Sequence, residues 1–424
     1  MEDKSLNIIS IFKELKTKHK ANLTVLNWSK YFGPGILITV GFIDPGNWAS
    51  NIAAGSDYSY SLLWMVTLST IMLILLQQNA SKIGMVTGLC MSEATMKFLK
   101  PIYGYLILGT AVTACIFTYF AEVLGAAIAL NMLFKIPLIL GAVFTSLIVV
   151  FMLYSQSYAH IEKYIIAFVS LIGFSFIYEL SIINVDWRAA VVGWVVPSMP
   201  HGSIFVILSV LGAVVMPHNL FLHSEIVQSR KFDISDEKKF KKQIRMSYLD
   251  TIFSMGIGWA INSAMIILAA ATFFAHGLHV DELQKAQKIL VPLIGDTSSL
   301  VFALALLFAG FSSSITASMA GGTIFAGIFS EPYDVKDIHT KGGIFITVFF
   351  ALLLMFFTSD PFQGLLLSQV LLSFQLPITI ILQLYLTSRT SVMGIYKNSR
   401  LLNAILWIIA IIVIYLNALL LLQT

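Results

Sequence analysis

Charged residues are scarce in this chain of 424 residues. Only 11% are Asp, Glu, Lys or Arg, whereas 58% are hydrophobic, and the mean hydropathy is +0.85. A soluble globular protein of this length needs far more polar surface, so that class is excluded. The start of the chain lacks the apolar core and small-residue cleavage site of a signal peptide, so we expect the first apolar segment to be retained. The composition predicts an all-α polytopic membrane protein whose main partner is the lipid bilayer.

Cysteine is almost absent, and so are the usual signatures of a metalloenzyme. Cys90 and Cys115 show no metal-ligand spacing, so we interpret them as ordinary apolar thiols, with no disulfide framework or zinc site. His218 and His223 are five residues apart, which does not place them on one helical face, and neither belongs to an H-E-x-x-H signature. An intramembrane metalloenzyme needs three good ligands and a metal-bound water. We therefore expect neither an enzyme nor a cofactor.

Apolar runs of roughly 17 to 25 residues predict eleven membrane spans. They lie at 33–55, 60–80, 103–133, 137–154, 162–181, 203–228, 247–275, 297–329, 343–358, 364–387 and 401–422. If the N-terminus is cytoplasmic, 22 of the 26 basic residues fall on the cytoplasmic side. The positive-inside rule then predicts a cytoplasmic N-terminus and, after eleven spans, a C-terminus outside. The lysine-rich stretch before the seventh span is thus an orientation signal, and we expect no nucleic-acid partner.

The first apolar run is interrupted near its middle by Asp44, Pro45, Gly46 and Asn47. Proline lacks an amide hydrogen and glycine is conformationally loose, so a continuous helix is not expected there. Near the middle of the membrane, unpaired backbone groups and a carboxylate are tolerated where protein buries them or where they line a polar cavity. We therefore interpret this stretch as one half of a binding site. The alternative is a proline-kinked helix whose aspartate bonds a neighbouring helix.

The sixth run repeats this interruption at Met216, Pro217, His218 and Asn219. The first run opens spans one to five and the sixth opens spans six to ten. A repeated unit with an odd number of spans must insert its second copy upside down, which predicts a 5+5 inverted repeat with a site where the two breaks meet. The expected organisation is a cytoplasmic segment, two repeats and a last helix, at 1–32, 33–181, 203–387 and 401–422.

The polar side chains at the two breaks suit a transition metal. Asp44 supplies a negative charge, Asn47 a neutral carbonyl oxygen and Met216 a thioether. A thioether is a poor ligand for Mg²⁺ or Ca²⁺ and a better one for Mn²⁺, Fe²⁺, Co²⁺ or Cd²⁺. A methionine in a membrane helix usually fills an apolar gap, but its place beside a helix-breaking proline favours a ligand here.

With these two motifs the sequence resembles the Nramp/MntH family of divalent metal transporters. The resemblance extends to Gly84–Gly88, Leu222–Ser224, Val227–Arg230 and Ser368–Ser373. It implies a LeuT-like fold with helices 1 and 6 unwound at mid-membrane, and uptake of Mn²⁺ or Fe²⁺, also Cd²⁺ or Co²⁺, by alternating access. The family's metal ligands fall on Asp44, Asn47, Met216 and the backbone carbonyl of Ala213. Gln369 matches a family position that approaches the metal when the site is occluded.

The resemblance also suggests a proton pathway that includes Asp44, Glu122 and His218. Glu122 is a carboxylate deep in the third span, and a histidine titrates near neutrality. His218 has an alternative role, which is to bond a backbone carbonyl released by Pro217, and we expect His223 to be structural. Most family members carry an aspartate where this chain has Tyr119, and arginines where it has Lys341. Both departures predict loosely coupled protons.

Several rivals stay open at this point. A related protein could carry Mg²⁺, or carry metal without protons, and a sodium-coupled amino-acid carrier shares the architecture. The last is disfavoured because a thioether does not recognise a carboxylate. Polar residues expected near the outer face could attract cations, but we interpret them as solvated surface: Asp57, His276, His279, Asp281 and Glu282.

Overall fold

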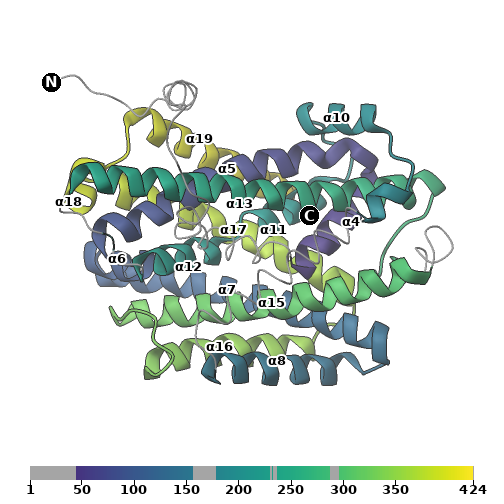
Figure 1. Cartoon of the computed structure of the whole chain (residues 1–424), viewed down its shortest axis with the longest axis horizontal. Coiled ribbons are helices and arrows are strands. Elements are labelled where there is room, and N and C mark those ends of the chain that lie inside the picture. Colours follow the sequence, from purple (N-terminus) through teal and green to yellow (C-terminus); the bar gives the residue numbers. More distant parts are fainter. Residues whose placement is uncertain (1–43, 156–177, 230–231, 233–235, 287–295, 424) are drawn as a thin grey trace, which may run out of the picture.

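A computed structural model describes residues 44–155, 178–229, 232, 236–286 and 296–423. The described residues form helices and no β-strand, and the long helices run side by side (Figure 1). Nine helical segments in this part of the chain are long and apolar enough to cross a membrane. The prediction of an all-α polytopic membrane protein is confirmed.

The long helices follow the predicted spans closely. They are α4 (Pro45–Tyr58), α5 (Leu63–Thr87), α7 (Pro101–Phe134), α8 (Leu138–Ser155), α11 (Ile204–Val214), α12 (Pro217–Gln228), α13 (Glu237–Thr272), α15 (Asp296–Ile328), α16 (Ile338–Met355), α17 (Pro361–Ser388) and α19 (Arg400–Gln423). The fifth predicted span, 162–181, lies mostly outside the described residues, as does the first part of 33–55. The count of eleven spans therefore stays a prediction.

Short helices connect the long ones. They are η1 (Ser59–Leu62), α6 (Met91–Phe98), α10 (Trp187–Val195), η2 (Phe274–His276), α18 (Thr390–Met393) and η3 (Gly394–Tyr396). One long helix extends beyond its apolar run, because α13 begins at Glu237 and not near residue 247. Asp236 caps its first turn by accepting a hydrogen bond from the Lys239 amide at 3.1 Å. The polar turns that follow continue the helix outside the predicted span.

The helices differ sharply in how much of them is covered. In the most apolar stretch of the α11–α12 segment 94% of the residues are buried, against 33% in α8 and in α19. α11 packs against α4 and α17, while α12 packs against α5 and α15. In Figure 1, α11 and α17 lie in the middle, and α8 runs with α16 along one edge. The segment with the second interruption is thus central, and the outer helices face the surroundings.

The sixth span is interrupted where the sequence predicts. α11 ends at Val214 and α12 begins at Pro217, so Val215 and Met216 lie between two helices. Proline is well suited to the first position of a helix, because its missing amide hydrogen has no partner there in any case. α4 likewise begins at Pro45, and the residues before Asp44 are outside the described part. Unwinding of both spans at mid-membrane, and the inverted repeat, stay predictions.

Candidate metal site

Asp44 is fixed at the start of α4 by its own helix. It is the N-cap, and its Oδ1 accepts a hydrogen bond from the Asn47 amide at 2.8 Å. Its Oδ2 accepts a second bond, from Nδ2 of Asn47 at 3.2 Å. Both residues are fully buried. The alternative in which Asp44 serves to bond a neighbouring helix is not what the described contacts show, because both of these bonds come from Asn47 in the same helix.

Ala213 brings the end of α11 to Asn47. In a continuous helix the Ala213 carbonyl would accept from the amide four residues later, but that residue is Pro217, which has none. The freed carbonyl accepts instead from Nδ2 of Asn47 at 2.9 Å. The start of α4 therefore meets the α11–α12 break, and the electronegative C-terminal end of α11 points at the residues around Asp44.

Met216 lies between α11 and α12 and is completely buried. Its sulfur accepts a hydrogen bond from Nδ2 of Asn219, at 3.5 Å, which holds the thioether in place. Asn219 was not among the predicted site residues. Its place in the motif that begins at Met216 was the available signal.

Gln369 comes from α17 and fits between the two breaks. A Cβ added at Gly46 would lie 1.9 Å from Nε2 of Gln369 and 3.0 Å from Oδ1 of Asp44. A Cβ added at Gly212 would lie 1.9 Å from the Gln369 carbonyl oxygen. These close approaches require glycine on both broken segments. Oε1 of Gln369 is buried and has no donor in hydrogen-bonding geometry among the described residues.

The structure thus brings together all five predicted metal-site residues, which are Asp44, Asn47, Ala213, Met216 and Gln369. They come from α4, from both sides of the α11–α12 break and from α17, and all are buried. The set offers one carboxylate, two amide oxygens, one main-chain carbonyl and one thioether. A mixture of oxygens with one soft sulfur suits Mn²⁺, Fe²⁺ or Cd²⁺ better than it suits Mg²⁺.

Glu122 lies on α7 close to the start of α4. It is fully buried and accepts a hydrogen bond from the Ser313 hydroxyl of α15. One turn later, a Cβ added at Gly125 would lie 2.0 Å from the Cβ of Pro45, so α7 packs directly on the proline beside Asp44. Ser313 was not predicted, although a polar run at 312–314 inside an apolar span was a signal for it.

His218 connects α12 to the same face of α7. Its Nδ1 lies 3.2 Å from Oγ1 of Thr118, which is one turn before Glu122. The carbonyl that Pro217 releases, Ala213 O, accepts from Asn47, and both roles considered for His218 stay predictions. His223 instead faces α5, with Nδ1 2.7 Å from Oε1 of Gln77, which agrees with a structural role.

Tyr119, at the position where the family has an acid, is a buried neutral group. Its hydroxyl donates to Oγ of Ser146 on α8 at 3.1 Å. Lys341, the other departure, is exposed in the first turn of α16. Neither residue supplies a buried charge to the Glu122 region.

The polar residues expected near the outer face lie apart from this site. His279 is largely exposed, and its Nδ1 lies 2.7 Å from Oδ1 of Asp57. Asp281 and Glu282 pair with Lys285 on the surface. These contacts fit the interpretation of a solvated surface.

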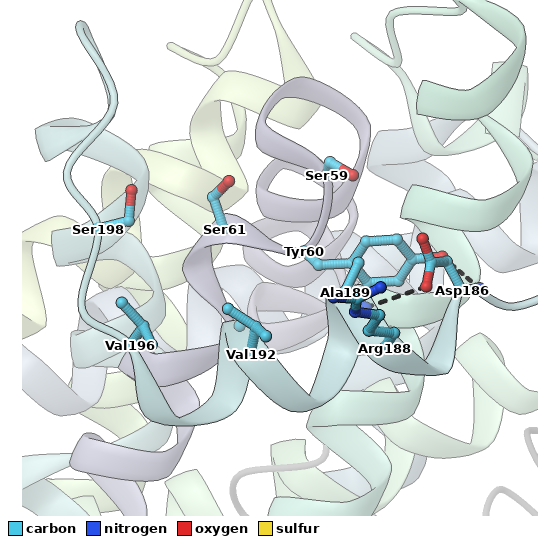
Figure 2. A pocket seen from close by; sticks show the side chains of 10 residues that line it. Ser59, Tyr60, Ser61, Asp186, Arg188, Ala189, Val192, Val196 and Ser198 are labelled. Atoms are coloured by element: carbon cyan, nitrogen blue, oxygen red, sulfur yellow. Dashed lines mark hydrogen bonds between the residues drawn. The ribbon is translucent and has the colours of Figure 1, made fainter.

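A cavity of ≈ 500 Å³ also lies away from the site, between η1 and α10 (Figure 2). Its lining includes Tyr60, Asp186 and Arg188, and Asp186 serves as the N-cap of α10. None of the five metal-site residues lines it, so this cavity is a feature of the connecting segments.

The chain is similar in sequence and in fold to known metal transporters. The chain is 37% identical over 413 residues to the divalent metal cation transporter MntH of Nostoc sp., covering 94% of this chain and 92% of that protein. It is 38% identical over 405 residues to MntH of Listeria innocua, covering 93% and 90%. The fold matches the crystal structure of the Eremococcus coleocola manganese transporter with a TM-score of 0.81 at 29% identity, covering 94% and 87%.

A more distant match concerns the fold alone. Mhp1, a nucleobase-cation-symport-1 family transporter, aligns with a TM-score of 0.61 at 17% identity, covering 83% of this chain and 77% of that one. The expected LeuT-like fold is confirmed by these structures. The profile of the family "Natural resistance-associated macrophage protein-like" (Nramp) matches residues 35–423. The chain therefore belongs to the Nramp family of transporters.

Proposed function

We propose that this protein carries divalent transition-metal ions across the membrane, with Mn²⁺ or Fe²⁺ as its physiological cargo and Cd²⁺ and Co²⁺ as further substrates. One observation carries the proposal. Asp44 and Asn47, at the start of α4, meet the freed carbonyl of Ala213 at the α11–α12 break, and Met216 is buried in that same break. The relatives named as divalent metal cation and manganese transporters support it.

The burial of the site supports alternating access. Asp44, Asn47 and Met216 are each fully buried, so an ion can reach them only if helices move. The breaks beside Pro45 and Pro217 provide places where the two halves of each span can move separately. Two inverted repeats, at 33–181 and 203–387, are the proposed frame for that movement, with 1–32 and 401–422 outside it.

Protons are the proposed co-substrate, with loose coupling. Glu122 and Thr118 lie one turn apart on α7, and His218 of α12 contacts Thr118. Pro45, next to Asp44, packs on the same helix at Gly125. Tyr119 replaces a carboxyl group with a hydroxyl whose proton is not released near neutral pH. Fewer titratable groups near the site support a variable number of protons for each metal ion.

The proposed location is a bacterial-type plasma membrane, with the N-terminus cytoplasmic and the C-terminus outside. The distribution of 22 of 26 basic residues on one side supports this orientation. The exposed apolar side chains of α8 and α19 suit contact with the lipid bilayer. The charge pattern does not favour a nucleic-acid partner.

The transport proposal is tested with purified protein in liposomes that contain a pH indicator. We expect saturable uptake of Mn²⁺, inhibited by Cd²⁺ and unaffected by a large excess of Mg²⁺, with internal acidification that varies relative to metal flux. A matched control is Asp44→Ala in the same liposomes, which removes uptake. Uptake of Mg²⁺ or of a radiolabelled amino acid, without Mn²⁺ uptake, would contradict the proposal.

A further inference from the structure

A second group of buried metal-binding side chains lies at the far end of α12. Cys90, Glu93 and Glu225 each offer a ligand atom, and these atoms all lie within 4.8 Å of one another. α12 begins next to Met216, and nine residues of helix rise separate Met216 from Glu225, which is about 13 Å. The group is therefore distinct from the site around Asp44.

The three side chains come from two segments and are nearly inaccessible. Cys90 and Glu93 open α6, whereas Glu225 lies in the last turns of α12. Cys90 is 0% exposed, Glu93 5% and Glu225 7%. Two carboxyl groups in such an environment need a compensating partner, because burying a charge alone is costly.

Local structure satisfies Glu93 more fully than Glu225, whose carboxyl group lies within hydrogen-bonding reach of the Cys90 thiol. Oε2 of Glu93 accepts from the Cys90 amide at 2.8 Å, which caps α6, and from Nε2 of Gln228 at 2.8 Å. Oε1 of Glu225 accepts one long bond, 3.3 Å, from the Tyr333 amide. Oε2 of Glu225 is buried and has no donor in hydrogen-bonding geometry among the described residues.

The electrostatics of the group favour a cation. Neither Glu93 nor Glu225 forms a salt bridge with any basic side chain that the structure describes. A divalent ion would neutralise the negative potential of the two buried carboxyl groups.

We propose that Cys90, Glu93 and Glu225 form a second cation site, which binds a thiophilic divalent ion such as Zn²⁺ or Cd²⁺. Thiolate sulfur and carboxylate oxygen are both ligand types that these ions accept. In a tetrahedral site the ligand atoms lie about 3.6 Å apart, so the three side chains need to close by at most about 1 Å. Oε1 of Gln228 is buried, has no donor among the described residues, and is available as a fourth ligand.

The chain offers a clean test because it contains only two cysteines. Cd²⁺ is titrated into the purified full-length protein, and the ultraviolet charge-transfer absorption of a Cd–thiolate bond is recorded. We expect one thiolate band per chain in the wild type and in Cys115→Ser. We expect none in Cys90→Ser. Cys115 is the matched control because it is also fully buried.

Two further variants assign the other ligands and separate this site from the transport site. Glu225→Gln keeps the size of the side chain. It should lower the Cd²⁺ affinity, measured from the titration of the band, by at least about tenfold. Met216→Ala should leave the band unchanged, because its sulfur is a thioether in the other site. Each variant is first shown to elute as a single species with the wild-type melting temperature.

The absence of a thiolate band in the wild type, at Cd²⁺ concentrations that saturate Mn²⁺ competition, would overturn the proposal. So would a band that persists in Cys90→Ser, or a Cd²⁺ affinity that is unchanged in Glu225→Gln. The transport proposal survives all three outcomes, since it depends on Mn²⁺ uptake through Asp44.

Discussion

The two ends of α12 both bring sulfur and carboxyl groups together, yet they differ in charge. Near Met216 there is one carboxylate, and the other donors are neutral amide and carbonyl oxygens. Near Glu225 there are two carboxylates and a thiol. Affinity for a divalent ion rises with the number of charged ligands. A transport site must also release its ion, so one charge suits transport and two or three suit retention.

A second comparison concerns the prolines. Pro377 lies inside α17 and frees the carbonyl of Ser373, as Pro217 frees that of Ala213. The Ser373 carbonyl accepts from Nδ2 of Asn417 in α19 at 2.9 Å, so that helix continues and no site forms. The two carbonyls therefore differ in their partners: the one that Pro217 releases meets the start of α4, and the one that Pro377 releases bonds a neighbouring helix.

The largest expected effect is that of Asp44→Ala, which removes the single charge of the transport site. We expect binding of Mn²⁺, Cd²⁺ and Mg²⁺ there to fall by at least about 100-fold, since breaking a buried charge pair costs several kcal/mol. Asp57→Ala, at the surface, should bind as the wild type does. Calorimetric titration of each ion measures this. Retained Mn²⁺ affinity in Asp44→Ala would mean that the ion binds elsewhere.

Gly46→Ala should come next, because its methyl group would overlap the amide of Gln369. Overpacking of this kind costs about 1–3 kcal/mol, and the displaced Gln369 no longer reaches the site. We expect weaker Mn²⁺ binding and a lower melting temperature. Gly109→Ala on α7 is the control, since a Cβ there meets no atom within 4 Å. Equal effects of the two variants would remove Gln369 from the proposed site.

Met216→Ala should change selectivity more than affinity. If the thioether contributes about 1.4 kcal/mol to a soft ion, its loss weakens Cd²⁺ about tenfold. Mn²⁺ should weaken mildly, while Mg²⁺ and Ca²⁺ gain, because a water oxygen that hard ions accept fills the space. Competition uptake in liposomes measures all four ions. Equal losses for soft and hard ions would show that Met216 only packs.

The smallest expected effect on metal affinity is that of Glu122→Gln. The side chain bonds Ser313 and lies on a different helix from every proposed ligand, so Mn²⁺ binding should change less than about threefold. Uptake should lose part of its pH dependence, because one titratable group is removed. Stopped-flow uptake across a pH series measures both. A fixed proton-to-metal ratio that Glu122→Gln leaves intact would contradict loose coupling.

Sequence reasoning could single out three of the proposed transport-site residues because they stand beside helix-breaking prolines. Asp44, Asn47 and Met216 are recognisable from local chemistry, since a broken membrane helix exposes the groups around the break. Gln369 and Ala213 came from the family resemblance, because neither an amide in α17 nor an alanine carbonyl is unusual in itself. The Ala213 carbonyl is free because Pro217, the first residue of α12, has no amide hydrogen to donate to it.

The second site was missed because its members are far apart in the chain. Cys90 was interpreted as an ordinary apolar thiol, and Glu225 was not considered. A glutamate three residues before the end of a predicted span resembles a polar side chain at the membrane surface. The contact between residues separated by more than 130 positions depends on how α6 packs against α12, and no local pattern encodes it.

The most direct test of the account is anomalous diffraction from crystals of the protein soaked in Mn²⁺. We predict one anomalous peak among Asp44, Asn47, Met216 and the carbonyl of Ala213, and its loss in Asp44→Ala crystals. A strong Mn²⁺ peak elsewhere in the chain, with none beside Asp44, would contradict the central claim.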